Sequence, residues 1–130
     1  MFRLLAFFCF SCVMISLNSF SQADPSGDVI EKIRKGNPVE LGTWLNEMVD
    51  LNIPGFKELY SKTQAARIIK DFFSDKPVSL VSVSKEGTAS DGSNYTMGSI
   101  TAGGKKFSLY FLTRKNNGEY RICQLQILND

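Results

Sequence analysis

The chain has 130 residues with 15 basic and 13 acidic side chains, a net charge of +2 and no histidine. This near-neutral balance gives no support for nucleic-acid binding, which usually requires a basic surface. The absence of histidine excludes Ser-His-Asp and Cys-His catalysis as usually built, and also histidine-ligated zinc, copper and iron sites. We therefore expect no metal, no cofactor and no catalytic residue.

The first stretch of the chain is typical of a cleaved signal peptide. A short basic start is followed by an uncharged apolar run over residues 4–17, and small residues precede the first acid, Asp24. The run is shorter than the roughly 20 apolar residues of a membrane-spanning helix. Cleavage before Asp24 or before Gln22 fits, and an uncleaved anchor and a lipoprotein signal are the weaker alternatives. We expect an exported protein, periplasmic or secreted, in which residues 1–23 are removed, residues 24–130 form one domain, and no membrane span remains.

Two of the three cysteines, Cys9 and Cys12, lie inside this apolar run with a C-x-x-C spacing. A redox motif of that type works in a folded domain, so we expect no redox function in a segment that is removed. Cys123 then remains without an internal disulfide partner. Its apolar strand pattern favours a buried thiol, with a reactive thiol or an intermolecular bridge as the alternatives.

Helical spacing of apolar residues predicts two helices after the leader. The first covers residues 27–37, and the second begins at Pro38, a residue suited to the first helical turn. Gly42 makes the second helix weak or short. Its apolar positions share one helical face and are Leu41, Trp44, Leu45 and Met48. Residues 49–54 then alternate as a short strand that Pro54-Gly55 ends.

The third predicted helix, over residues 62–73, has the strongest helical signal in the chain. It carries a broad apolar stripe, and Ser61 and Gln64 at its start form a capping box. Four β-rich segments follow, with a hairpin signal at Asn116-Asn117-Gly118 before the last, and they cover residues 78–85, 94–102, 105–115 and 119–128. Helices followed by an antiparallel meander indicate an α+β fold with the helices on one face of the sheet.

Alternation within the last two strands assigns side chains to the two faces of this sheet. The residues expected to face the helices are Phe107, Leu109, Phe111, Cys123, Leu125 and Ile127. The opposite face carries Tyr110, Leu112 and Ile122, and it is less polar than a water-facing side should be. Either the sheet curls over its own contents or another chain covers it. These three residues are therefore the candidate interface for a homodimer or for an envelope protein partner.

Four phrases of the sequence, together with the order of the elements, resemble a known family. They are residues 33–45 (IRKGNPVELGTWL), 62–73 (KTQAARIIKDFF), 97–112 (MGSITAGGKKFSLYFL) and 120–127 (YRICQLQI). The chain resembles the cystatin-like, nuclear-transport-factor-2-like superfamily and, more narrowly, the small exported bacterial proteins called domain of unknown function 4783. The resemblance implies a cone of helices on a curved antiparallel sheet of about four main strands, a pocket between helix and sheet, and often a dimer through the sheet. It implies no reaction, because the narrow family has none assigned.

An apolar pocket with a single hydroxyl group is the pattern of a small-molecule site. The candidate lining residues, between the helix at 62–73 and the sheet, are Trp44, Phe73, Tyr95, Met97, Phe107 and Phe111. The same residues also fit an ordinary core with a tyrosine at its rim. No inward strand position carries an acid that could serve as a general base. We therefore expect a non-catalytic binding or protein-interaction module, with a binder of a small apolar ligand, or an enzyme using this pocket, as the alternative.

Overall fold

The computed structural model describes residues 24–130, so the predicted signal peptide and its two cysteines lie outside the described residues. The elements, in chain order, are α1 (Ser26–Arg34), the 3-10 helix η1 (Pro38–Trp44), β1 (Leu45–Ile53), β2 (Phe56–Ser61), α2 (Lys62–Phe73), β3 (Val78–Thr88), β4 (Asn94–Ala102), β5 (Lys105–Asn116) and β6 (Glu119–Asn129). The six strands form one sheet in the order β2-β1-β6-β5-β4-β3. β1 and β6 are parallel, and every other neighbouring pair is antiparallel.

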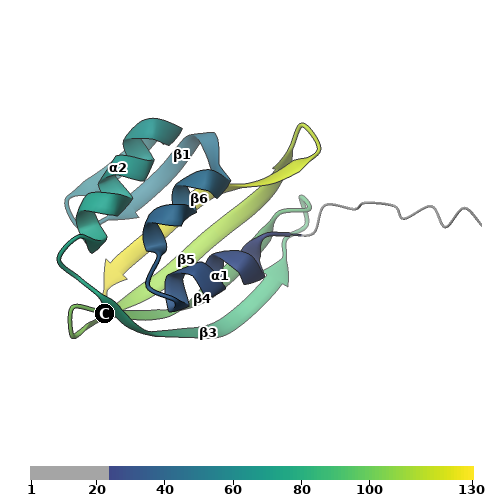
Figure 1. Cartoon of the computed structure of the whole chain (residues 1–130). Helices are drawn as coiled ribbons and strands as arrows, with labels where there is room; N and C mark the ends of the chain where they lie inside the picture. The colour runs from purple at the N-terminus through teal and green to yellow at the C-terminus, as the bar shows by residue number, and fades with distance from the viewer. Residues whose placement is uncertain (1–23) are drawn as a thin grey trace, which may run out of the picture.

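The helices cover one face of the curved sheet, as the α+β prediction required (Figure 1). α2 packs on β1 and β2, whereas α1 packs on β3, and η1 joins the two helices. The apolar stripes of α1 and α2 meet the inward side chains of the strands in one buried cluster that includes Ile33, Ile69, Ile100, Phe111 and Leu125. Burial of this single cluster is the main force that holds the layers together.

The capping box predicted for α2 is confirmed. The Ser61 hydroxyl accepts a hydrogen bond from the Gln64 backbone amide at 3.3 Å, and the Gln64 side chain accepts one from the Ser61 amide at 3.4 Å. These bonds satisfy two amides that the first turn of the helix leaves without partners. α2 therefore begins where the sequence places it, and it buries Ala65, Ile69 and Phe73 against the sheet.

The prediction of a second helix running through Met48 is wrong. Only Pro38–Trp44 is helical, as a 3-10 helix, and Leu45 already begins β1. Residues Leu45 to Ile53 pair with β6 on one side and β2 on the other, and this long-range pairing outweighs the helical spacing of the apolar residues. Gly42 has a packing role here, because a Cβ atom at this position would lie 3.2 Å from the Ala66 Cβ on α2.

The sheet is also larger than the predicted antiparallel sheet of about four main strands. β1 is longer than the strand expected at 49–54, and β2 follows it through the Pro54-Gly55 turn, in which Gly55 has a φ of 90°. β2 was missed because its sequence, FKELYS, shows no clear alternation of apolar and polar residues. Two strands thus precede α2, and β1 lies beside the last strand, which makes the sheet mixed.

A β-bulge on β6 corrects the predicted faces of this strand. Leu112 pairs with Gln124 and Thr113 pairs with Ile122, so Cys123 is an extra residue in β6. Because side chains alternate along a strand, one extra residue reverses the face to which the preceding residues of the strand point. Ile122 is 0% exposed and belongs to the core, whereas Leu125 and Ile127 lie inward as predicted. Cys123, predicted to face the core, is half-buried.

Candidate functional site

The six residues predicted to line a pocket do not surround one space. Phe73, Phe107 and Phe111 are buried in the core, and Trp44 packs against it from the end of η1. Tyr95 pairs with Leu112, and Met97 pairs with Tyr110, on adjacent strands. Residues directly opposite one another in a ladder point to the same face, so Tyr95 and Met97 lie on the outer face of the sheet, away from the helices.

The space between α2 and the sheet is occupied by side chains from both layers. Ala65 and Ile69 of α2 meet Val49 and Leu51 of β1 there, and all four are fully buried. Within residues 24–130, every buried side-chain nitrogen or oxygen atom has a hydrogen-bond partner. The predicted pocket site therefore contains an apolar core with no unpaired polar group directed into it.

The sheet presents a second surface, which we call the central outer face. It consists of ten outward side chains in the middle of the three strands β4, β5 and β6, namely Tyr95, Met97, Ser99, Thr101, Ser108, Tyr110, Leu112, Gln124, Gln126 and Leu128. None of these side chains carries a charge. All are half-buried against their neighbours except Met97, which is 41% exposed. Depletion of charge together with tyrosine and methionine is the composition of the central part of a protein interface.

Charged residues border the central outer face on all sides, and Lys106 and Arg114 lie on the same face of β5 at the two ends of the uncharged stretch. Lys85 of β3 lies opposite Met97, and Asp50 of β1 lies opposite Gln124. An outward residue of a sheet covers about 32 Å², given strands about 4.8 Å apart and about 6.7 Å between residues on one face. Ten residues cover roughly 320 Å², which is the size of a functional surface patch but less than half of the roughly 800 Å² that each partner contributes to a stable complex.

Of the three predicted interface residues, the structure places Tyr110 and Leu112 on the central outer face and Ile122 in the core. The sequence prediction does not include Tyr95 and Met97 in this face. Tyr95 and Met97 lie on this face because they pair with Leu112 and Tyr110 of β5. The register of that pairing depends on the neighbouring strand and not on local spacing.

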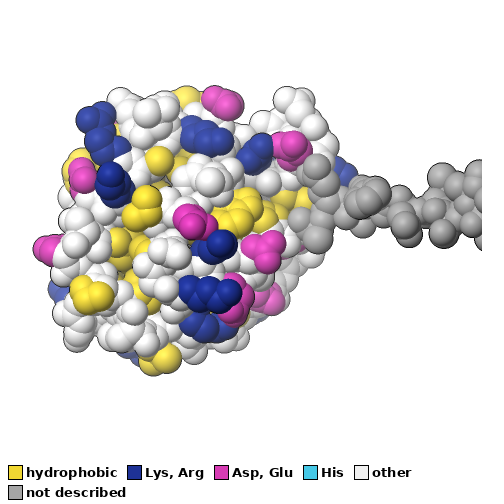
Figure 2. All heavy atoms as spheres, in the orientation of Figure 1, with side chains coloured by type: hydrophobic (Ala, Val, Ile, Leu, Met, Phe, Trp, Pro, Cys, Tyr) yellow, Lys and Arg dark blue, Asp and Glu magenta, His cyan; other side chains and the backbone are white. Residues whose placement is uncertain are grey.

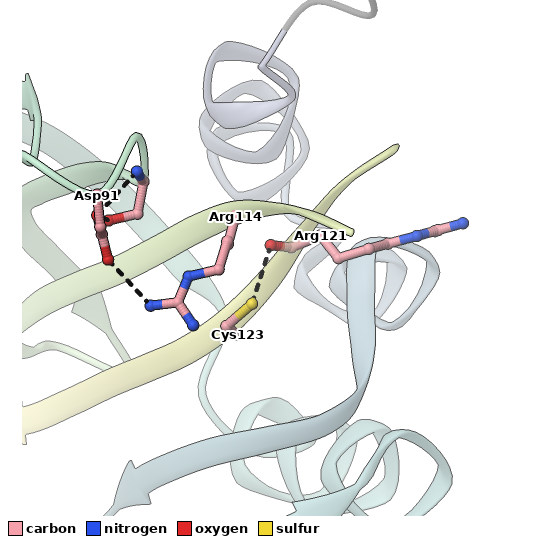
Figure 3. A network of polar contacts seen from close by, with 5 residues as sticks. Asp91, Arg114, Arg121 and Cys123 are labelled. Atoms are coloured by element: carbon pink, nitrogen blue, oxygen red, sulfur yellow. Dashed lines mark hydrogen bonds and ion pairs between the residues drawn. The ribbon is translucent and has the colours of Figure 1, made fainter. Parts of the chain in front are cut away.

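Cys123 lies at the β-bulge beside a group of polar contacts (Figure 3). Its thiol donates a weak hydrogen bond to the Arg121 carbonyl oxygen at 3.6 Å. Burial raises the pKa of the Cys123 thiol, and the Arg114 charge opposes this shift only partly. The thiol is therefore protonated at neutral pH and is a poor nucleophile.

The same region is tied to the β3–β4 loop by Asp91 (Figure 3). One Asp91 carboxylate oxygen accepts hydrogen bonds from the Ser93 hydroxyl at 2.5 Å and the Ser93 amide at 3.0 Å. The other oxygen accepts one from Arg114 at 3.4 Å. These donors hold the pKa of Asp91 below its ordinary value, with the Ser93 hydroxyl contributing most. These contacts hold the β3–β4 turn against β5. Among residues 24–130, no three histidine, cysteine or acidic side chains converge closely enough to bind a metal.

A second acid, Asp24, joins the start of the described chain to the sheet. Its Oδ1 atom accepts hydrogen bonds from the Ser26 amide at 3.2 Å, the Ser26 hydroxyl at 2.7 Å and the Thr113 hydroxyl at 2.9 Å. Thr113 is 0% exposed. We call this set of three residues the Asp24 clasp, and it fixes the approach to α1 against β5.

Solved structures with the same architecture come from several bacteria. A protein from Bacteroides uniformis is 29% identical with a TM-score of 0.73, over 82% of this chain and 96% of its own. A protein from Bacteroides fragilis is also 29% identical with a TM-score of 0.71, over 78% and 95% of the two chains. An NTF2-like protein from Cytophaga hutchinsonii is 14% identical with a TM-score of 0.57, over 81% and 92%, and this likeness shows the fold alone.

No curated protein matches the sequence. Both Bacteroides structures are described as DUF4783 family proteins, and the sequence profile of that family, Domain of unknown function (DUF4783), matches residues 26–127. This match covers most of the chain, and the fold is that of the NTF2-like proteins, with three helices on a six-stranded mixed, curved sheet. The chain belongs to the DUF4783 family.

Proposed function

We propose that this protein is an exported, non-catalytic interaction module that acts through the central outer face of its sheet. The observation that carries the proposal is the absence of charge from all ten side chains of that face, two of which are tyrosines. In a sheet with one face exposed to water, every second residue of a strand points to that face, and these residues are normally charged or polar. An uncharged face instead has a small desolvation cost when a partner removes it from water.

The proposed partner is a second copy of the chain. Within the uncharged stretch, two such faces meet without like charges opposing one another; the Lys85 ammonium group, 5.9 Å from the centre of the Tyr95 ring, lies at its border. The limited area of the face predicts weak, concentration-dependent association rather than a permanent dimer. An envelope protein of different sequence is the other partner that the same face could accept.

The packed interior supports this role over that of a pocket enzyme or a carrier of a small apolar ligand. Catalysis would need a titratable group in a cleft, and the space beneath α2 holds aliphatic and aromatic side chains instead. No helix within residues 24–130 is long and apolar enough to cross a membrane.

Light scattering across a concentration series tests the proposal. We expect the mean mass to rise from monomer toward dimer as the protein approaches about 1 mM, the range in which weak contacts form. Tyr110→Lys, which places a charge in the middle of the face, should keep the protein monomeric, whereas Thr63→Lys on the exposed side of α2 should associate like the wild type. A wild-type protein that stays monomeric throughout, and that retains no envelope protein which Tyr110→Lys loses, would overturn the proposal.

Export is tested separately by the mass of the purified mature protein. We expect an N-terminus at Asp24 or Gln22. An intact Met1 on membrane-embedded protein would contradict the signal-peptide interpretation.

A further inference from the structure

A hollow of about 210 Å³ lies on the helix-bearing side of the molecule, away from the central outer face. The turn after α1, the end of α2 and the start of β3 border it, and it is open to solvent on one side. Most of its wall is apolar and consists of Pro38, Val39, Phe73, Pro77 and Val78. A hollow of this size on the surface has room for a compact group of a few heavy atoms.

The apolar wall reaches the surface. Val39 is 49% exposed, although valine side chains are usually buried, and Phe73 at the base of the hollow is 7% exposed. Figure 2 shows hydrophobic side chains at the surface in the region between α2 and α1, with charged side chains around them. An apolar group placed in the hollow would therefore cover surface that is now in contact with water.

Two lysines and no acid line this hollow. Lys76 already has partners, because its Nζ atom donates to the Phe72 carbonyl oxygen at 3.2 Å and to Asp75 at 2.9 Å. Lys70 belongs to none of the ion pairs within residues 24–130. Lys70 precedes Phe73 and Ser74 on α2 by three and four residues, so the three side chains share one face of the helix and border the same space.

The end of α2 does not cancel this positive charge. Carbonyl groups at a helix C-terminus carry partial negative charge when they lack partners. Here the Asp71 carbonyl oxygen accepts from Ser74, the Phe73 carbonyl oxygen accepts from the Lys76 amide, and the Phe72 carbonyl oxygen accepts from the Lys76 side chain. The hollow thus combines an apolar wall with a lysine that has no carboxylate partner in the described chain.

We propose that this hollow binds a small monocarboxylic acid with a short branched aliphatic group. The aliphatic group covers Val39 and Phe73, and the carboxylate lies beside the Lys70 ammonium group. The chemistry follows from charge complementarity at Lys70 together with the small apolar volume. This site is independent of the interaction proposed for the sheet, because it uses none of the same residues.

Titration followed by two-dimensional nuclear magnetic resonance tests the proposal, using ¹⁵N-labelled protein purified after expression of the full chain. The probe is isocaproate, and the matched probes are isocaproamide, which lacks the charge, and acetate, which lacks the aliphatic group. We expect saturable shifts of the amides at residues 36–39 and 70–78 with isocaproate, with a Kd on the order of 1 mM for a ligand of about eight heavy atoms.

Variants separate the two parts of the site. Lys70→Gln should weaken isocaproate binding about fivefold, as expected for loss of one partly exposed ion pair. Val39→Asp should abolish it, and both positions are exposed, so the fold should persist. Lys62→Gln, at the opposite end of α2, should bind like the wild type. Equal affinity for isocaproamide, an unchanged affinity in Lys70→Gln, or no saturable shift at tens of millimolar would each overturn the proposal.

Discussion

The Asp24 clasp makes a specific prediction about coupling between residues far apart in the chain. Thr113→Val keeps the shape of the side chain but removes the hydroxyl donor to Asp24. A hydrogen bond to a charged group stabilises the fold by about 1.5–3 kcal/mol, and a buried methyl group in place of the hydroxyl adds about 0.8 kcal/mol of stability. We expect Thr113→Val to lower the free energy of unfolding by about 1 kcal/mol.

Asp24→Ala should cost more, about 2–3 kcal/mol, because it also leaves the fully buried Thr113 hydroxyl without a partner. In the Thr113→Val background that hydroxyl is gone. Asp24→Ala should then cost only the bonds from Ser26, about 1 kcal/mol. The two substitutions together are therefore predicted to lower the free energy of unfolding by about 1–2 kcal/mol less than the sum of their separate effects.

Urea unfolding of the four proteins at neutral pH, with linear extrapolation, measures this coupling. Thr101→Val serves as the control, since it makes the same change at a half-buried position on the outer face of β4 and should alter stability by less than about 0.5 kcal/mol. If the costs of Asp24→Ala and Thr113→Val add to within about 0.5 kcal/mol, the two side chains are not coupled and the clasp does not exist in solution.

Three further results are expected. Gly98→Ala should destabilise the fold by about 3 kcal/mol in urea, since its Cβ would lie 2.0 Å from the Ser82 carbonyl oxygen, whereas Gly27→Ala, with open space around it, should be neutral or stabilising. Alkylation of Cys123 should be slow at pH 8 and accelerate in urea, because burial raises the pKa of its thiol; equal rates would contradict this. The stability advantage of the wild type over Asp91→Asn should be constant above the ordinary pKa of 3.8 and shrink as pH falls below it, because the pKa of Asp91 is lowered in the folded state; a difference that does not change with pH would refute this.

Elements with local signals could be predicted from the sequence. The start of α2 depends on Ser61 and Gln64, three residues apart, and the β5–β6 hairpin depends on Asn117 and Gly118, whose φ angles of 51° and 82° suit those residue types. Each signal involves neighbours in the chain, so no knowledge of the tertiary structure was needed. The family resemblance extended these local predictions to the correct fold class.

Features that depend on strand pairing could not be predicted in this way. Leu45 and Met48 fit a helical face as well as a strand, and only the neighbouring β6 and β2 decide between them. The bulge at Cys123 depends on the register with β5, and it moves Ile122 from the outer face to the core. Tyr95 and Met97 lie on the outer face because of their register with Leu112 and Tyr110, so the candidate site lies on the sheet surface and not in a pocket.

The parallel pairing of β1 with β6 has a consequence for how the chain acquires its structure. β1 and β2 are joined to the remaining strands only through β6, so the sheet stays in two parts until the final strand enters its middle. Contacts between segments so distant in sequence form slowly, because the long loop between them must close first. A nascent chain that lacks β6 therefore cannot complete its core. For a protein that is exported as we propose, this delay would keep the polypeptide unfolded until β6 is present, and an unfolded chain is able to cross a membrane in extended form.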